Sequence, residues 1–174
     1  RLIATGDLHD NPLHLARLIE AAGLFGESDG GTERRSDEGG EAVGADPSVA
    51  SSVRGSAPSH LVLHEIIHSD RLINGMDFSY RALARVAALK ADFPELVHTL
   101  LANHELSQIV GAGIVKDGIK VVQAFNDGVE YAFGDDAPAV NEAIAEFVRS
   151  MPLALRCVCS RPQTGSGIGR AGGG

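Results

Sequence analysis

The chain has 174 residues, a formal net charge of −8 and a pI near 5.3, and 44% of its residues are hydrophobic. This length is sufficient for one domain with a substantial core. The acidic balance gives the surface no general attraction for nucleic-acid phosphate, and no apolar run approaches the roughly 18 residues that a membrane span requires. We therefore expect neither nucleic acid nor a membrane as a partner.

The cysteine pattern bears on the cellular compartment. Cys157 and Cys159 form a C-x-C pair near a glycine-rich end, which is neither a disulfide framework nor a four-ligand zinc spacing. This pattern favours a reducing compartment, and we expect a cytoplasmic protein. The sequence enters a strand-like run directly at Arg1, without a methionine, which we interpret as the start of a fragment.

The first expected elements are a short strand at the start of the sequence and a helix that begins at Pro12. Asn11 can cap this helix, Pro12 suits its first position, and Gly23 ends it. The intervening loop has the sequence "TGDLHDN" and lies at the carboxyl end of the strand. Open α/β sheets place their ligands at such ends.

Two stretches have the composition of unstructured chain. Residues 26–58 are rich in glycine, serine, alanine and acidic residues and offer few apolar groups to bury. We predict a disordered insertion whose two ends lie close together, because loop-closure entropy grows slowly with length. The tail, residues 157–174, is of low complexity, and we expect no regular structure in it.

The segment "HLVLHEII", residues 60–67, predicts a buried strand of aliphatic and β-branched residues. Leu63, Ile66 and Ile67 also fit one face of a helix. Periodicity alone leaves both interpretations open at this point.

A clearer helix is expected in "MDFSYRALARVAALKADFPE", residues 76–95. Asp77 or Ser79 stands near its start, and Pro94 lies just past its end. The residues on its apolar side are Leu83, Val86, Ala87 and Leu89.

Three further elements follow. "LVHTLLANHE", residues 96–105, predicts a strand and then a polar turn, and "IKVVQAF", residues 119–125, resembles another strand. After a turn at "FGDD", residues 133–136, an amphipathic helix is expected in "AVNEAIAEFVRSM", residues 139–151, which Pro152 ends.

The order strand, helix, strand, helix, strand predicts right-handed crossovers and at least partly parallel pairing. We therefore expect an α/β domain over residues 1–156, with helices packed on a mixed, largely parallel sheet. In such a sheet the polar clusters that follow the strands share one edge.

Polar side chains with metal-binding chemistry follow two of the expected strands. Asp7 and His9 form a D-x-H pair after the first strand, and both can reach one cation from the same loop. Asn103 and His104 follow the strand near residue 100. Either pair alone is typical of solvated loop residues. Because both pairs are expected at the same edge of the sheet, they are together candidate metal ligands.

Together, the clusters "GDLHDN" and "ANHE", with a helix between strands, resemble the metallophosphoesterase superfamily, the calcineurin-like phosphoesterases that include the serine/threonine protein phosphatases. The family pattern is G-D-x-H, G-D-x-x-D and G-N-H-E or G-N-H-D, each at a strand end. Here the first motif is intact, and in the third Ala102 replaces glycine. The resemblance implies a partial metallophosphoesterase-type sandwich.

The resemblance also implies roles for individual residues. Asp7 and His9 would hold one metal, Glu65 would bridge two metals, Asn103 would ligate the second, and His104 would donate a proton to the leaving alcohol. The implied cofactors are two divalent ions of Mn, Fe or Zn, which activate phosphoryl groups. The expected substrate is a phosphoprotein or a small phosphoester.

The middle motif departs from the family pattern. Where G-D-x-x-D belongs, the chain has "HEIIH", so that Glu65 falls on the bridging aspartate and His68 on the second aspartate. His68 is thus a candidate for the substrate region or for support of the metal ligands. Arg71 follows closely and could contact phosphate, because arginine matches phosphate oxygens in a fork.

The same letters permit a zinc peptidase. H-E-x-x-H on a helix places His64 and His68 one turn apart as zinc ligands, with Glu65 as the general base. This alternative requires a stable helix and a third ligand downstream. An extended metzincin spacing is absent, because Arg71 and Asn74 stand where glycine and histidine would be required.

The later family motifs are missing from this sequence. The family completes its site with G-H and G-H-x-H motifs, whereas no histidine follows His104 here. The resemblance therefore ends near residue 125, with an indistinct continuation to about residue 156, and we expect an incomplete metal site. A non-catalytic remnant or interaction module of the same fold is a further alternative.

Overall fold

The computed structural model of the protein describes residues 1–24, 57–111, 115–116 and 118–158. The predicted insertion and the predicted tail lie almost entirely outside these ranges. In chain order the elements are β1 (Leu2–Asp7), α1 (Pro12–Ala22), β2 (His60–His64), α3 (Tyr80–Asp92), β3 (Val97–Leu100), α4 (Asn103–Val110), β4 (Val115–Lys116), β5 (Ile119–Lys120), α5 (Val121–Phe133), the 3₁₀ turn η2 (Gly134–Asp136) and α6 (Ala137–Arg149).

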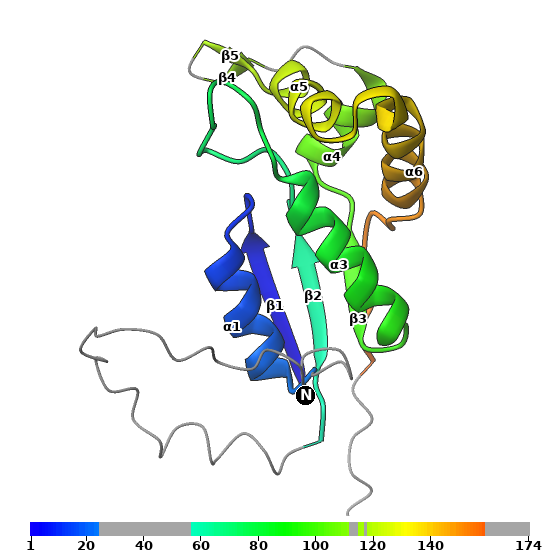
Figure 1. Ribbon diagram of the computed structural model, residues 1–174. Coiled ribbons are helices and arrows are strands. Elements are labelled where there is room, and N and C mark those ends of the chain that lie inside the picture. Colours follow the sequence, from blue (N-terminus) through cyan, green and yellow to red (C-terminus); the bar gives the residue numbers. More distant parts are fainter. Residues whose placement is uncertain (25–56, 112–114, 117, 159–174) are drawn as a thin grey trace, which may run out of the picture.

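The protein is α/β, as predicted. Its main sheet has three strands in the order β1-β2-β3, and both pairings are parallel. The expected mixture of directions is not present within this sheet. Antiparallel pairing in the described part of the chain occurs between the two-residue strands β4 and β5 and in an isolated bridge between Ile73 and Met76. Each parallel pairing follows a helical crossover, since α1 joins β1 to β2 and α3 joins β2 to β3 (Figure 1).

Helix α1 begins and ends where the sequence predicts. The side chain of Asn11 accepts a hydrogen bond from the backbone N–H of His14 at 3.0 Å, and Pro12 occupies the first turn. Gly23 ends the helix in the left-handed conformation, with φ of 69°. The buried side of the helix, which carries Leu15 and Ile19, packs into the core.

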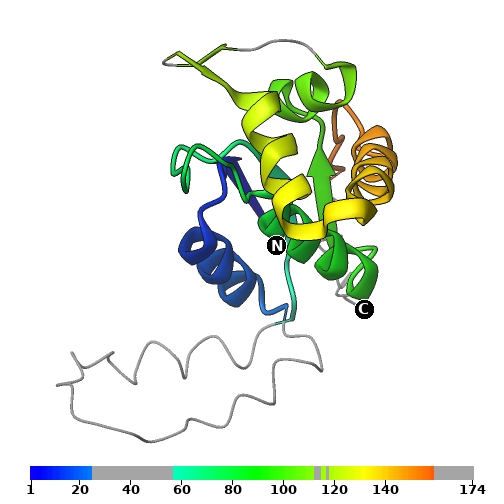
Figure 2. The same ribbon diagram turned by 45° about the horizontal axis from the view of Figure 1, so that its top comes forward.

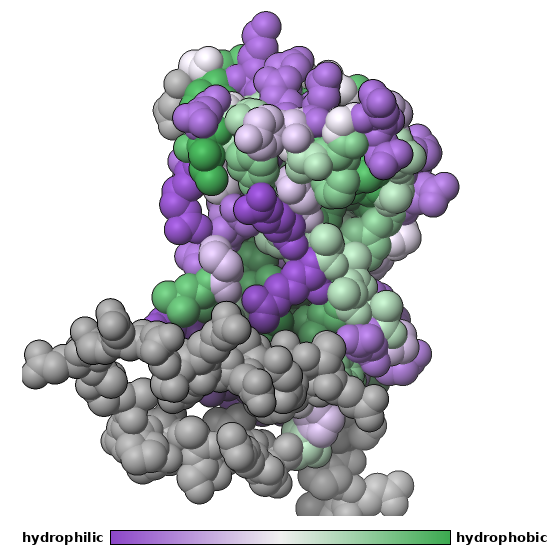
Figure 3. Space-filling view, viewed as in Figure 1, coloured by the Kyte–Doolittle hydropathy of each residue, from purple (hydrophilic) through white to green (hydrophobic). Residues whose placement is uncertain are grey.

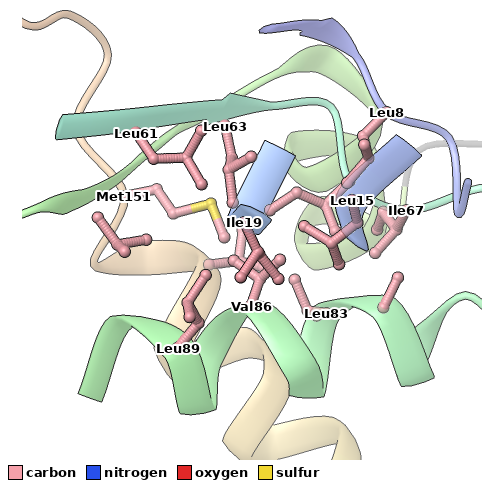
Figure 4. Packing of buried hydrophobic residues seen from close by; sticks show 14 of the residues in the cluster. Leu8, Leu15, Ile19, Leu61, Leu63, Ile67, Leu83, Val86, Leu89 and Met151 are labelled. Atoms are coloured by element: carbon pink, nitrogen blue, oxygen red, sulfur yellow. The ribbon is translucent and has the colours of Figure 1, made fainter. Parts of the chain in front are cut away.

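The core lies between the sheet and the two crossover helices. Figure 4 shows side chains of β2, α1 and α3 pointing into one apolar space. Leu83, Val86 and Leu89 are buried on the apolar side of α3, as predicted, and Ala87 is half-buried. Fully burying one such aliphatic side chain stabilises the fold by about 1.5–3 kcal/mol, so this layer fixes where the strand ends lie.

Two sequence predictions of strands are wrong in part. β2 ends at His64, because Glu65 has a positive φ of 48° that breaks the extended backbone. The segment 119–125 forms only two residues of strand before α5 begins at Val121. Its apolar residues Val121, Ala124 and Phe125 are buried at helical spacing, which the short apolar run could not reveal.

Helices α4, α5 and α6 form a group beyond the carboxyl ends of the strands, and Figures 1 and 2 show this arrangement from two directions. The helix predicted over residues 139–151 is confirmed as α6, which extends from Ala137 to Arg149.

In the described part of the chain, no helix has both the length and the apolar character needed to cross a bilayer. Hydrophilic and hydrophobic patches lie side by side in the coloured part of Figure 3.

Helix α5 is attached to the segment that precedes α3. The backbone N–H of Asp77 donates to the carbonyl of Ala124 at 2.9 Å. Gly128 faces the same point, because a Cβ atom there would lie 2.0 Å from the carbonyl oxygen of Asp77. This close approach of two backbones brings the buried ring of Phe125 against His68, with ring centroids 5.9 Å apart.

Candidate metal centre

The carboxyl ends of the three parallel strands bring polar side chains together. Asp7 ends β1, Glu65 follows β2, and His104 lies in the first turn of α4, directly after β3. His9 comes from the loop after β1, and its ring lies 5.1 Å from that of His104, measured between centroids. The sequence therefore correctly predicts a shared edge for these residues.

The backbone holds the first two loops against each other. The N–H groups of Leu8 and His9 both donate to the carbonyl of Glu65 at 2.9 Å, and the N–H of Asp10 donates to that of Ile66, also at 2.9 Å. Positive φ values accompany these contacts at His9, Asp10, Glu65 and His68. Such conformations are unfavourable for residues other than glycine, and they concentrate at functional sites.

A register irregularity in β1 directs Asp7 toward β2. Ala4 pairs with Val62, and the next aligned pair is Asp7 with His64. One extra residue of β1 is therefore accommodated, as in a β-bulge, which reorients the side chains that follow it. As a result, Oδ1 of Asp7 lies 3.2 Å from Nδ1 of His64.

Glu65 stands between two groups of potential ligands. Its Oε1 lies 3.2 Å from Nε2 of His104, and its Oε2 lies 4.0 Å from Nδ1 of His64. One group consists of His9, Glu65 and His104, and the other of Asp7, His64 and Glu65. In each group the ligand atoms lie within 4.8 Å of one another. Glu65 belongs to both groups, which is the position that a bridging carboxylate occupies.

The pKa values of the two carboxylates are shifted in opposite directions. Burial raises the pKa of Glu65, and the negative charge of Asp7 raises it further. A hydrogen bond from Glu65 lowers the pKa of Asp7. Glu65 thus retains a proton more readily, and Asp7 carries the negative charge. A cation bound between them would replace that proton, because metal ligands must be deprotonated.

His68 supports His104 from the side away from Glu65. The two Nδ1 atoms lie 2.8 Å apart, so one ring donates to the other, and Nε2 of His68 lies 3.1 Å from Oε1 of Gln108. The backbone N–H of His68 donates to Oγ of Ser79 at 3.0 Å. Burial lowers the pKa of His68 to about 4. His68 is therefore neutral at pH 7 and orients the ring of His104.

Glu105 holds the loop after β2 in place. Its Oε1 accepts hydrogen bonds from the backbone N–H groups of Ile66 and Ile67 at 2.6 and 3.1 Å, and the residue is fully buried. With Ile66 and Ile67 buried in the core, the loop turns Glu65 and His68 toward the strand ends. From the sequence, Glu105 was only a possible distant third ligand of a zinc peptidase, and its support of this loop was not predicted, although it completes the quoted "ANHE" motif.

The remaining predicted residues have different surroundings. Asn103, predicted as a ligand, is exposed in the first turn of α4, next to His104. Arg71, predicted near phosphate, donates from its guanidinium to the backbone carbonyl of Asp10 at 3.0 Å. This hydrogen bond positions a positive charge beside the loop that carries His9.

The grouping of ligands differs from the one that the resemblance implies. Asp7 is paired with His64, for which the sequence suggested a role only in a zinc peptidase, and His9 is paired with His104. The signal for His64 was its place at the end of a strand, directly before Glu65. The structure thus brings Asp7, His9, Glu65 and His104 together as predicted, but in a different arrangement.

The geometry that a zinc peptidase requires is not present. Residues 65–69 form neither helix nor strand, whereas the peptidase motif needs both histidines on one helical face. His64 contacts Asp7, and His68 contacts His104 and Gln108. The two histidines of "HEIIH" therefore serve different neighbours.

The donor set is suited to divalent ions. Two carboxylates and three imidazoles, from Asp7, Glu65, His9, His64 and His104, are the ligands that Mn, Fe and Zn accept. Burial and the negative charge of Asp7 raise the pKa of Glu65, and a cation bound beside it would favour its ionised form. Comparison of the chain with family models, curated proteins and solved structures finds no match.

Proposed function

We propose that the protein is a metal-dependent phosphoester hydrolase whose centre holds two divalent ions of Mn, Fe or Zn. The observation that carries the proposal is the position of Glu65, which contributes one carboxylate to two ligand groups. A shared carboxylate is the feature that distinguishes a dinuclear centre from two unrelated sites. The arrangement at the carboxyl ends of parallel strands further supports a ligand site there.

Each group of residues has a part in this proposal. Asp7, His64 and Glu65 would hold one ion, and His9 with Glu65 would hold the other. Such a pair of ions supplies Lewis-acid activation of a phosphoryl group. Nε2 of His104 faces Glu65, and its Nδ1 contacts His68. His104 would therefore hold a proton at a fixed position and deliver it to the leaving oxygen.

The substrate in this proposal is a phosphorylated protein or a small phosphoester. Arg71 lies beside the loop of His9 and offers a guanidinium to phosphate oxygens. The net charge of −8 gives no support for a nucleic-acid substrate. Placement in the cytoplasm also stays a prediction from the cysteine pattern.

The test of the centre is calorimetric titration of Mn²⁺ and Zn²⁺ together with hydrolysis of p-nitrophenyl phosphate. Asp7→Asn and Glu65→Gln each remove a charged ligand, and we expect at least a tenfold loss of affinity. Because Glu65 serves both groups, Glu65→Gln should also reduce the number of ions bound from two to at most one. Glu130→Gln, an exposed change on α5, is the matched control. Unchanged binding in both site variants would refute the centre.

His104 can be tested separately as proton donor. If it donates a proton, His104→Ala lowers turnover and leaves the metal content unchanged, as measured by atomic emission. Loss of one ion in His104→Ala would show that this ring is a ligand, since its Nε2 lies within the same group as His9 and Glu65.

A non-catalytic metal-binding module is the second candidate. The observation that favours it is the arrangement of the ligands, because Asp7 is grouped with His64 rather than with His9, and Asn103 is exposed. On this reading the chain binds the ions with the same dependence on Asp7 and Glu65 but does not hydrolyse phosphoesters. Metal binding without turnover of p-nitrophenyl phosphate would support this candidate over the hydrolase.

A further inference from the structure

The sheet has a second face, opposite the core. Leu61 and Leu63 of β2 point toward the crossover helices, as Figure 4 shows. Side chains alternate along a strand, so His60 projects from the other face. The register pairs Val62 with His98 of β3, which places His98 on that face too, diagonally across from His60.

The two imidazoles lie unusually close for exposed side chains. Nδ1 of His60 lies 3.1 Å from Nε2 of His98, and the ring planes differ by 17°. A single hydrogen bond between neutral rings contributes only about 1 kcal/mol. The same separation suits two ligands of one tetrahedral zinc ion, because Zn–N bonds of about 2.05 Å place the two nitrogens about 3.3 Å apart.

A thiol borders the same space. His60, His98 and Cys157 line a cavity of about 440 Å³ on this face. Cys157 is exposed and free. Among the described residues, it does not belong to a group of three whose ligand atoms lie within 4.8 Å of one another, so its sulfur must move inward to join both rings. Leu153, four residues before it, and Val158, directly after it, are 81% and 76% exposed, so neither side chain is packed in the core.

We propose that His60, His98 and Cys157 form a separate Zn²⁺ site on the face of the sheet opposite the core. Two imidazoles and one thiolate are a typical three-ligand zinc set, with the fourth position left to water or a ligand. On binding, the thiol of Cys157 releases its proton and its sulfur forms a bond to zinc. The ion would tie the segment after α6 to strands β2 and β3.

Nearby positive charges oppose this site without excluding it. Arg1 and Arg156 line the same cavity and would repel a cation. Both residues are exposed, so water and salt screen their charges. Arg156→Gln should therefore strengthen zinc binding, by an amount that shrinks as the salt concentration rises.

The site is distinct from the strand-end centre. His60 and His64 occupy opposite ends of β2, and four residues of strand span about 13 Å. The strand-end ligands include no cysteine. A spectroscopic signal from a metal–sulfur bond therefore reports on this site alone and does not depend on the proposed hydrolase.

The experiment is titration of Co²⁺, as a stand-in for zinc, into the full chain under reducing conditions. We expect a thiolate-to-cobalt charge-transfer band that Zn²⁺ abolishes by competition. His60→Gln, His98→Gln and Cys157→Ser should each remove the band and weaken binding at least tenfold. Circular dichroism would verify that these variants, which all alter side chains with exposed atoms, remain folded.

Two controls make the assignment specific. Asp7→Asn alters only the strand-end centre and should leave the band intact. Cys159→Ser removes the other cysteine of the sequence and should also leave it. The proposal is overturned if the parent chain shows no band, if the band survives in the double variant of His60 and His98, or if Cys159→Ser removes it while Cys157→Ser does not.

Discussion

At the scale of single residues, the geometry of the candidate metal centre depends on Glu105. One of its oxygens accepts from two successive backbone N–H groups, while Oε2 is buried without a hydrogen bond to the described part of the chain. Burying a carboxylate is costly unless it is well paired. This cost is tolerated because the carboxylate satisfies Ile66 and Ile67 where the chain leaves β2, and so sets the direction of Glu65.

We expect Glu105→Ala to destabilise the fold by about 3 kcal/mol or more. The change leaves two buried N–H groups unsatisfied, at about 1–3 kcal/mol each, and opens a cavity. Glu105→Gln retains one acceptor oxygen and should cost clearly less. Urea unfolding measures both. Equal losses for alanine and glutamine would show that the side-chain oxygen does not support the loop.

His68 should make stability depend on pH in the absence of metal. Its pKa falls from 6.5 to about 4 in the folded chain, mainly through burial. Because the folded value lies below the unfolded one, the native state favours neutral His68. The resulting contribution of His68 to the free energy of unfolding is fully present above pH 6.5. As the pH falls toward 4, this contribution is lost, and the loss reaches up to about 3 kcal/mol.

The measurement is urea unfolding at pH 7 and pH 5 with a chelator present. His68→Gln removes the titrating ring but keeps a polar side chain of similar reach, so its stability should fall less between the two pH values. A parent and a variant with the same pH dependence would contradict the expected contribution of His68.

At the scale of elements, the position of α5 relative to the centre is set by one close contact. Gly128 lies against the backbone carbonyl of Asp77. The side-chain carboxylate of Asp77 also accepts hydrogen bonds from the backbone N–H groups of Ser69 and Ser79. The segment between β2 and α3 is therefore fixed at both ends. This keeps Phe125 against His68.

Gly128→Ala should separate these two elements. The added methyl group would lie 2.0 Å from a backbone oxygen, so the helix must shift, which typically costs about 1–3 kcal/mol in a packed interior. Glu130→Ala, an exposed change on the same helix, is the control and should alter stability by less than about 0.5 kcal/mol. Thermal unfolding of both variants measures the difference. Equal melting temperatures would mean that the contact between Gly128 and Asp77 does not fix α5.

The elements differ in how well the sequence predicts them. α1 has a cap, a proline and a final glycine, all local signals, and it forms within the predicted limits. The residues after Lys120 have no such signals, and their burial against His68 and the loop at Asp77 selects a helix. Tertiary contacts thus determine the secondary structure of this segment, which the local sequence pattern does not determine.

The same distinction applies to the site. Asp7, His9 and His104 were predictable because they directly follow strands, and parallel strands share an edge. The pairing of Asp7 with His64 was not, because it depends on the irregular register of β1. The role of Glu105 depends on hydrogen bonds to residues 39 and 38 positions earlier, which no local pattern encodes.

At the scale of the whole molecule, the two ends of the predicted insertion adjoin each other. The N–H of Ser59 donates to the carbonyl of Ala22 at 2.8 Å, and a Cβ atom on Gly23 would lie 3.8 Å from Cα of Pro58. The expectation that the ends lie close together is therefore confirmed. The predicted disorder of the insertion concerns residues outside the described ranges and stays a prediction.

Deletion of residues 27–57 should leave thermal stability unchanged or slightly higher. The ends need not move, and shortening the loop about tenfold recovers up to about 2 kcal/mol of closure entropy. Calorimetry of the shortened chain would measure this. A large drop in melting temperature would show that the deleted residues contribute packing to the domain.

The adjacency of Ala22 and Ser59 has a consequence for how the protein could be divided. If the chain is cut within residues 27–57, the first fragment carries β1 and α1 with Asp7 and His9, and the second carries Glu65 and the remaining ligands. Neither fragment alone can fill both ligand groups. If the proposed centre binds its ions only in the joined fragments, these ions would draw the fragments together by mass action, and a cut protein would then reassemble in proportion to the metal supplied.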